Sequence, residues 1–293
     1  LSGLGYGLLN LGASVFVIAR AGQREKGAAM GEFTAGLFAG SLCGCAAGGL
    51  MADRLGFGPV FYAAAFIFLV VWTLILTLFP KDQPGQEAGE EGPDKLGFKT
   101  LLGFASDRRV LNMGLSQVLP AAIVSVGLLN YFLPIHMGRI GAGPSAVGQL
   151  NILFSLTLVF LGPRFGRAID ASRRKYAYLA LGGLFAAAAT SSFFLAPALA
   201  GALIGILFLG LSHAISENGH PAYLLQLPAA KRIGVGPSIS LYSSLIRIGQ
   251  ALGPLTIAAA LSRGGLKGLV WVGGAMVAIN LLFALTSRQA EAP

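Results

Sequence analysis

The stretch Tyr176–Ser216 reads YAYLALGGLFAAAATSSFFLAPALAGALIGILFLGLSHAIS and contains no Asp, Glu, Lys or Arg. A helix that crosses the hydrocarbon core of a bilayer needs about 20 mostly apolar residues, so this stretch is long enough for two crossings. Proline lacks a backbone N–H and interrupts helices, and Ala196-Pro197-Ala198 divides the stretch near its middle. The stretch therefore predicts two consecutive membrane helices joined by a short turn.

The composition extends this prediction to the whole chain. Of the 293 residues, 55% are hydrophobic and only 11% are charged, and the mean hydropathy is +0.72. A soluble domain carries about 25% charged residues, which cover its surface. We therefore expect an all-α membrane protein built as a polytopic helical bundle, and we exclude a soluble domain.

Apolar runs of spanning length predict about nine transmembrane helices. Two come from Tyr176–Ser216, and Arg247 is the one charge inside any of the others. The other runs are Leu1–Ala19, Phe33–Ala52, Leu55–Pro80, Val110–Gly138, Ile140–Pro163, Ile233–Ser262 and Gly268–Ser287. Because the first run has no positive n-region and no cleavage site, we expect it to be a helix, and we expect further helices to precede it.

An acidic segment divides the spans into three and six. Lys81–Lys99 is rich in Asp, Glu, Gly and Pro, so it cannot bury apolar surface and is expected to be a flexible linker. The apolar positions of Leu96–Phe104 predict a short interfacial helix after it. The expected domains are 1–80, a partial N-terminal bundle of three helices; 81–109, a cytoplasmic linker; and 110–293, a C-terminal six-helix bundle.

The basic residues between the spans predict the orientation, because cytoplasmic loops carry an excess of Lys and Arg. Sixteen fall on one side and four on the other, which places the C-terminus in the cytoplasm. The larger group is Arg20, Arg24, Lys26, Lys81, Lys95, Lys99, Arg108, Arg109, Arg164, Arg167, Arg173, Arg174, Lys175, Lys231, Arg232 and Arg288; the smaller is Arg54, Arg139, Arg263 and Lys267. This placement explains the net charge of +9 without nucleic-acid binding.

Glycines repeat every four residues in the second span. Residues four apart share one helix face, and a face of glycines lets another helix approach closely. The motif Gly249-Gln-Ala-Leu-Gly253-Pro254 repeats the spacing six spans later, which predicts two related halves; chance spacing in a chain with 42 glycines is the alternative. The ladder consists of Gly36, Gly40, Gly44, Gly48 and Gly49.

The segment Gly162–Lys175 joins the fifth and sixth spans and carries Gly166, Asp170, Arg173 and Arg174. An acid beside a basic cluster at such a junction can form an ion-pair latch, here a candidate cytoplasmic gate. Anchoring by positive charge alone is the alternative, although it does not explain Asp170.

Together these motifs resemble the major facilitator superfamily. The glycine ladder is similar to the antiporter motif of family helix five, although Cys45 stands where the family usually has proline. Gly166–Lys175 resembles the loop motif between helices eight and nine, Met51–Phe61 is compatible with the junction of helices five and six, and Lys81–Lys99 resembles the linker between the two bundles. The resemblance implies a two-bundle fold in which the nine spans are family helices four to twelve, in a chain truncated at its N-terminus.

The resemblance also implies a function. It implies a secondary active transporter that moves a small solute by alternating access and is driven by an ion or proton gradient; the antiporter-like ladder favours efflux. We expect a monomer in a bacterial-type inner (plasma) membrane, with the lipid bilayer and a small-molecule substrate as partners, no cofactor and no enzymatic activity. A transport-inactive membrane sensor or receptor is the alternative, and a membrane-embedded enzyme is a third.

By the resemblance, the first, fourth and seventh spans line the central cavity. An interhelical hydrogen bond is the alternative role for each polar residue there. His213 and Glu217 are four apart and could form a proton-sensitive pair. The substrate cavity candidates are Tyr6, Asn10, Ser14, Gln117, Asn130, Tyr131, His213 and Glu217.

Three charged residues are candidates for coupling or buried charge, because ionisable groups inside spans are costly. Arg247 lies well inside its span and needs a partner, for which Glu217 is the candidate; a structural pair that pins two helices is the alternative. Glu32 is expected in the first turn of its span, where it would complement the helix N-terminus or couple to protons.

Other residues have structural expectations. Pro120 and Pro134 predict kinks in the fourth span, and His220 is expected in a cytoplasmic loop. Cys43 and Cys45 are two apart and point to different helix faces, so they predict packing rather than a disulfide or a metal site.

Overall fold

The computed structural model describes residues 26–78, 98–196 and 198–290, together with Gly5, Gly12, Ala13 and Phe16. Over these residues the chain is helical, and seven helical segments are long and apolar enough to cross a membrane. The expectation of an all-α polytopic membrane protein is confirmed. Almost all of the expected first span, Leu1–Ala19, and residues 81–97 of the expected linker lie outside the described residues.

The chain divides into two compact units, Leu1–Gly92 and Pro93–Pro293. In the first unit, α2 (Lys26–Leu55) and α3 (Phe57–Leu78) form a helical hairpin, and Gly56 makes the turn with a positive φ of 79°. Because α2 begins at Lys26, Glu32 lies beyond its first turn. The expected role of Glu32 at a helix N-terminus is therefore wrong, and its side chain lies outside the described residues.

The second unit opens with a short helix, α4 (Phe98–Ala105), and then one continuous helical run from Arg108 to Arg139. This run consists of α5 (Arg108–Met113), η1 (Gly114–Val118), α6 (Leu119–Val126), η2 (Gly127–Phe132) and α7 (Leu133–Arg139). The remaining elements are α8 (Pro144–Ala171), α9 (Lys175–Leu195), α10 (Ala198–Leu224), α11 (Pro228–Ile233), α12 (Val235–Gly264) and α13 (Leu266–Ala290).

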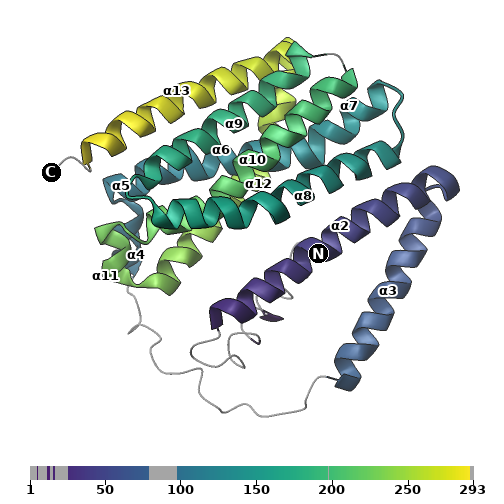
Figure 1. The fold of residues 1–293 in the computed structure, drawn as a ribbon, viewed down its shortest axis with the longest axis horizontal. Helices are drawn as coiled ribbons and strands as arrows, with labels where there is room; N and C mark the ends of the chain where they lie inside the picture. Colours follow the sequence, from purple (N-terminus) through teal and green to yellow (C-terminus); the bar gives the residue numbers. More distant parts are fainter. Residues whose placement is uncertain are drawn as a thin grey trace. The chain divides into compact units, whose positions relative to one another are not determined.

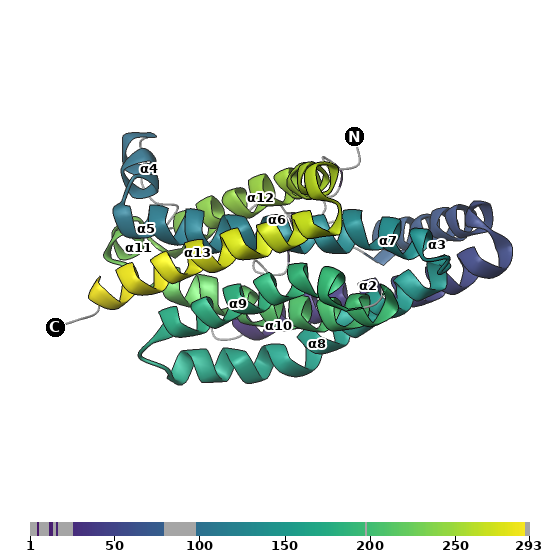
Figure 2. The same cartoon turned by 90° about the horizontal axis from the view of Figure 1, so that it is seen from above.

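The second unit contains six of the seven candidate spans. Successive spans run in opposite directions, and in Figure 1 the α8–α9 turn, α5, α11 and the end of α13 lie at the same end. Figure 2 shows α8, α9 and α10 on one side of this unit and α6, α12 and α13 on the other. Helix α10 packs against α8 and α9, α12 packs against α6, and α13 packs against α9 and so joins the two sides.

Two helices extend further than the sequence predicts. The break at Pro197 is confirmed, since α9 ends at Leu195 and α10 begins at Ala198. However, α8 runs through Pro163 to Ala171, so most of the expected loop Gly162–Lys175 is helical. Likewise, α10 continues to Leu224, so Glu217 and His220 lie in the helix; the expectation that His220 lies in a loop is wrong. Charges marked the predicted ends, but a membrane helix continues beyond the bilayer until its backbone turns.

The two prolines of the long run are accommodated by π-helical turns. Segment η1 ends two residues before Pro120, and η2 ends two residues before Pro134. A proline removes one N–H from the helix and crowds the preceding turn, and a wider π turn relieves this crowding. Such turns often mark functional sites in helices, and these two place irregular backbone at the expected positions of the kinks.

Glycines bring α12 against α6 and η2. A Cβ at Gly253 would lie 2.7 Å from the Ile123 oxygen, and one at Gly249 would lie 2.7 Å from the Ala122 Cβ. A Cβ at Gly127 would lie 2.8 Å from the Gly253 oxygen. These backbones approach too closely for any side chain, as in small-residue packing between membrane helices.

The first ladder shows no such approach within the part of the chain that the structure describes. A Cβ at Gly36, Gly40 or Gly44 would meet nothing within 4 Å, and one at Gly48 would reach Val60 at 3.9 Å. Gly49 is half-buried in α2. The packing role of this ladder stays a prediction.

Candidate functional site

Three helices of the second unit line one small polar recess. Each contributes residues spaced three or four apart, so each presents one face: α6 and the residue before it, α10, and α12. The recess has a volume of about 30 Å³, which is the space of about one water molecule. Its lining consists of Val118, Ala121, Ala122, Ser125, His213, Ser216, Glu217, His220, Tyr242, Ile246 and Gln250.

His213 and Glu217 form the ionisable pair of the recess. They lie one turn apart on α10, and the His213 Nε2 is 3.3 Å from the Glu217 Oε1. The His213 side chain is 25% exposed and that of Glu217 is 51% exposed. The centroid of the Phe154 ring lies 5.5 Å from that of the imidazole, and the two rings are tilted by 42°. The recess thus holds an imidazole and a carboxylate side by side within an apolar bundle.

Arg247, for which the sequence suggests Glu217 as a partner, forms a hydrogen bond along α12, and its partnership with Glu217 stays a prediction. The Arg247 Nη1 donates to the Gln250 Oε1 at 2.9 Å, while Glu217 forms its ion pair with His213. Gln250 itself lines the recess. Arg247 is exposed, and its guanidinium is connected to the recess through the Gln250 side chain.

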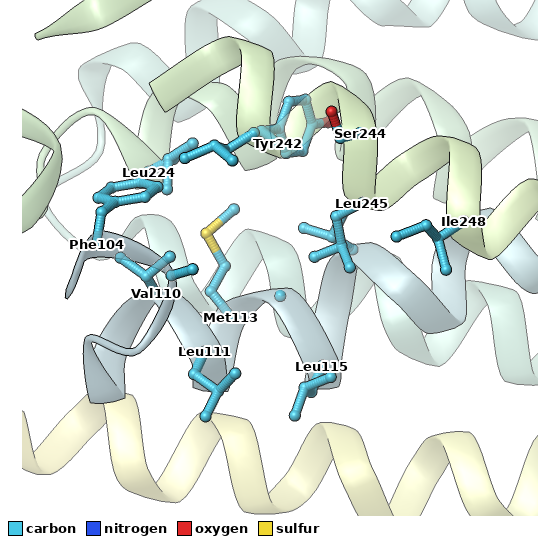
Figure 3. A pocket seen from close by; sticks show the side chains of 14 residues that line it. Phe104, Val110, Leu111, Met113, Leu115, Leu224, Tyr242, Ser244, Leu245 and Ile248 are labelled. Carbon is cyan, nitrogen blue, oxygen red and sulfur yellow. The ribbon is translucent and has the colours of Figure 1, made fainter. Parts of the chain in front are cut away.

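An apolar cavity adjoins the recess. It has a volume of about 300 Å³ and shares Val118 and Tyr242 with the recess. Figure 3 shows Met113 pointing into it from below and Tyr242 and Leu245 bounding it on the α12 side, with Phe104 of α4 at one end. An apolar space next to a few polar groups is the usual form of a small-molecule site.

Gln117 lies outside the recess, in a buried interhelical hydrogen bond. Its Nε2 donates to the Asn280 Oδ1 at 2.7 Å, and the Asn280 Nδ2 donates to the Ala180 oxygen at 2.6 Å. Asn280 therefore connects η1, α9 and α13. Gly183 leaves the space for this group, since a Cβ there would lie 2.6 Å from the Asn280 Cγ. This geometry matches the structural alternative for Gln117.

The other cavity candidates do not line the recess or lie outside the described residues. Asn130 is exposed and Tyr131 is half-buried, both in η2, and neither lines the recess. Tyr6, Asn10 and Ser14 lie outside the described residues.

At the α8–α9 turn, the acid pairs with a residue that the sequence analysis did not place in the gate. The Asp170 Oδ1 lies 3.9 Å from the Lys175 Nζ, and the same Nζ donates to the Ile169 oxygen at 3.1 Å. Lys175 is buried, whereas Asp170, Arg173 and Arg174 are exposed. Gly166 faces Asn218 of α10, whose Oδ1 would lie 3.2 Å from an added Cβ. Lys175 therefore makes the side-chain contacts that stabilise this turn.

Several residues of the recess were missed by sequence reasoning. They are Ser125, eight residues after Gln117, Ser216, three residues after His213, and Tyr242, which shares a face of α12 with Ile246 and Gln250. A search for polar residues along one face of each span would have found them. His220 is also buried there, with its ring 6.2 Å from that of Tyr242.

Within the described residues no group of three or more His, Cys, Asp or Glu side chains is placed to hold a metal ion. Cys43 is exposed and Cys45 half-buried, and both are free thiols. The chemistry available at the recess is therefore that of proton binding, hydrogen bonding and apolar contact.

Comparison with known proteins agrees with this architecture. The family model of the Major Facilitator Superfamily matches residues 1–237. The chain is also similar to the multidrug resistance protein MdtG of Citrobacter koseri, with 25% identity over 164 residues, or 54% of this chain and 39% of that protein. The chain thus spans well under half the length of this relative. With seven helices in its described part that are long and apolar enough to cross a membrane and a family match over most of its residues, the chain belongs to the major facilitator superfamily.

Proposed function

We propose that this chain forms part of a secondary active transporter that moves a small solute across the membrane by alternating access. The observation that carries the proposal is the pairing of His213 with Glu217 in a recess that opens beside an apolar cavity. Charged groups inside a membrane bundle are costly and are retained where they handle ions or substrates. The transport site in this proposal consists of the recess, the apolar cavity and Arg247 behind Gln250.

The two adjoining spaces support a solute with an apolar body and a polar or cationic group. The recess alone has room for about one water, so the body of the solute would occupy the apolar cavity and its polar group would face Glu217. The similar protein from Citrobacter koseri is named a multidrug resistance protein, which supports export of such a solute.

Proton coupling would act through the carboxylate. A charged Glu217 attracts a cationic solute, whereas a protonated Glu217 does not, so proton binding and solute binding oppose each other at one group. His213, whose Nε2 lies 3.3 Å from the Glu217 Oε1, would hold the carboxylate in position. The net result is exchange of a proton for a solute, as in an antiporter. Glu32 is a second candidate for coupling.

The conformational change is assigned to the long helical run and to the α8–α9 turn. Segments η1 and η2 flank α6, which carries one wall of the recess, and π turns can change their width without breaking the helix. The Asp170–Lys175 contact, with Gly166, Arg173 and Arg174 beside it, would hold one conformation as a gate.

The orientation follows from charge. In the second unit, most basic residues gather at the end that holds α5, α11 and the α8–α9 turn (Figure 1), and we assign this end and the C-terminus to the cytoplasm. The proposed domains are 1–80, 81–109 and 110–293, and the unit boundary at Gly92 falls within the proposed linker. We also propose a non-enzymatic monomer in a bacterial inner membrane.

The test is proton-driven flux of a fluorescent hydrophobic cation by the full-length protein in proteoliposomes. Glu217→Gln should reduce driven flux by at least about tenfold, the effect of losing about 1.4 kcal/mol of coupling. His213→Gln should also reduce driven flux, because the pair is lost, and the matched carboxylate control Asp53→Asn, which is not one of the residues lining the recess or the apolar cavity, should transport normally.

Two results would contradict the proposal. Equal driven flux by Glu217→Gln and wild type would remove the site assignment. Absence of flux for any tested solute under any imposed gradient, with retained ligand binding, would instead favour a transport-inactive membrane sensor.

A further inference from the structure

A second polar space lies at the end of the bundle that carries Arg108 and Arg109. It has a volume of about 550 Å³ and lies between the start of the long helical run, the end of α10 and the end of α13. Two guanidinium groups and five hydroxyl or amide side chains line it, together with two leucines. The residues are Arg108, Arg109, Leu111, Asn112, Leu115, Ser116, Tyr223, Thr286 and Ser287.

Hydrogen bonds between helices fix the walls of this space. The Asn112 Nδ2 donates to the Thr286 Oγ1 at 3.0 Å, which ties α5 to α13. The Tyr223 hydroxyl donates to the Ser287 Oγ at 3.4 Å, which ties α10 to α13. The space is therefore formed by the fold itself and does not need a ligand to assemble it.

The positive charges of the two arginines in this space are available to bind an anion. The neighbouring carboxylate of Asp107 accepts from the backbone N–H groups of Arg109 and Val110 and pairs with Arg232 at 3.7 Å. Among the described residues, Arg108 and Arg109 form no ion pair with an acidic side chain, and both are exposed. Each guanidinium presents five N–H donors in a fork that fits phosphate oxygens.

The leucines indicate that the ligand is an amphiphile. Leu111 is 47% exposed and Leu115 is 50% exposed, one turn apart on the membrane side of the arginines. In Figure 3 both point toward α13, away from Met113 and Tyr242. A phosphate held by the arginines would thus continue into an apolar chain lying over Leu111 and Leu115.

We propose that this space, the interfacial arginine pocket, binds the phosphate headgroup of an anionic phospholipid, with an acyl chain over Leu111 and Leu115. Basic pockets between transmembrane helices suit anionic headgroups. The bound lipid would contact α5, α10 and α13 at the membrane surface, at a site that shares Leu111 and Leu115 with the apolar cavity and no residue with the recess. The inference requires membrane insertion of the bundle but not transport.

The test is native mass spectrometry of the full-length protein in detergent, offered phosphatidylglycerol or phosphatidylcholine with identical acyl chains. Each basic residue near an anionic lipid contributes about 1 kcal/mol, so Arg108→Gln/Arg109→Gln should weaken phosphatidylglycerol binding on the order of 30-fold. The control Arg167→Gln/Lys231→Gln removes two exposed charges at the same end of the bundle and should bind like wild type.

Further variants separate the lipid from other phosphates and protect against misfolding. Arg108→Lys/Arg109→Lys keeps both charges and should retain most of the binding. Leu111→Asn/Leu115→Asn should weaken phosphatidylglycerol binding while leaving the charges in place. Inorganic phosphate and glycerol 3-phosphate should fail to displace the lipid.

Each opposite result overturns the proposal. Equal binding of phosphatidylglycerol by the glutamine pair and wild type removes the site. Equal weakening by the control pair means that overall surface charge attracts the lipid. Displacement by inorganic phosphate, or tight binding of phosphate alone, makes the ligand a free anion.

Discussion

A methyl group at Gly253 provides the sharpest test of the packing that positions the recess. In Gly253→Ala, the new Cβ would lie 2.7 Å from the Ile123 oxygen and 2.9 Å from the Gly127 nitrogen. Ordinary contacts begin at 3.4 Å, so α12 and α6 must separate by at least about 0.7 Å, the difference between 3.4 and 2.7 Å. Both obstacles are backbone atoms, which cannot move aside as a flexible side chain does.

This separation should cost about 1–3 kcal/mol, as overpacking of a core does. Alanine regains up to about 1 kcal/mol of helix propensity, so the comparison needs a matched variant. Gly274→Ala provides it, because Gly274 lies in the interior of another membrane helix, α13, has nothing within 4 Å of an added Cβ and gains a similar helix propensity. The stability difference between the two variants then isolates the clash.

The assay is thermal unfolding of both purified full-length variants in the same detergent, monitored by tryptophan fluorescence. Each kcal/mol should separate the midpoints by about 2–4 °C, with Gly253→Ala lower. Transport should also fall in Gly253→Ala, because Gln250 moves with α12 away from α6. A midpoint for Gly253→Ala equal to or above that of Gly274→Ala would refute the close approach of the two helices.

Further predictions concern polar contacts at the start and in the first third of the long helical run. Asn280→Leu should lower the free energy of unfolding by about 1–2 kcal/mol, because Gln117 is left buried without its partner. The double variant Gln117→Leu/Asn280→Leu should lose less stability. A larger loss for the double variant in calorimetry would contradict the stabilising role of the Gln117–Asn280 hydrogen bond. Asp107→Ala should cost about 1 kcal/mol through loss of the helix cap, whereas Arg232→Ala should cost at most about 0.5 kcal/mol, since its ion pair is solvent-exposed. Equal losses for Asp107→Ala and Arg232→Ala in denaturant titrations would show that the ion pair, and not the cap, matters.

The membrane class and most helix positions could be predicted from the sequence. A helix in lipid requires a long apolar run, so the break at Pro197 and the run from Arg108 to Arg139 can be predicted from the sequence alone. Helix ends are predicted less well, because the first charged residue after an apolar run marks the end of the apolar run and not the end of the helix. In fact α8 continues to Ala171 and α10 to Leu224.

The candidate site was predicted in part. The spacing of His213 and Glu217 indicated a pair, since residues four apart share a face. Which residue of another helix meets them depends on helix rotation and packing, which one sequence does not specify. For this reason the sequence indicates Gln117 as a cavity candidate but not its hydrogen bond to Asn280, and it does not indicate the hydrogen bond of Arg247 to Gln250.

The central claim is that the recess among α6, α10 and α12 is reached from both sides of the membrane in turn. The direct measurement places a cysteine at Gln250 in full-length protein whose Cys43 and Cys45 are serine. A membrane-impermeant maleimide is then applied to right-side-out and to inside-out vesicles. The account predicts labelling from both sides, with a proton gradient shifting the ratio and Glu217→Gln removing that shift. Labelling from one side only, whatever the gradient, would contradict it.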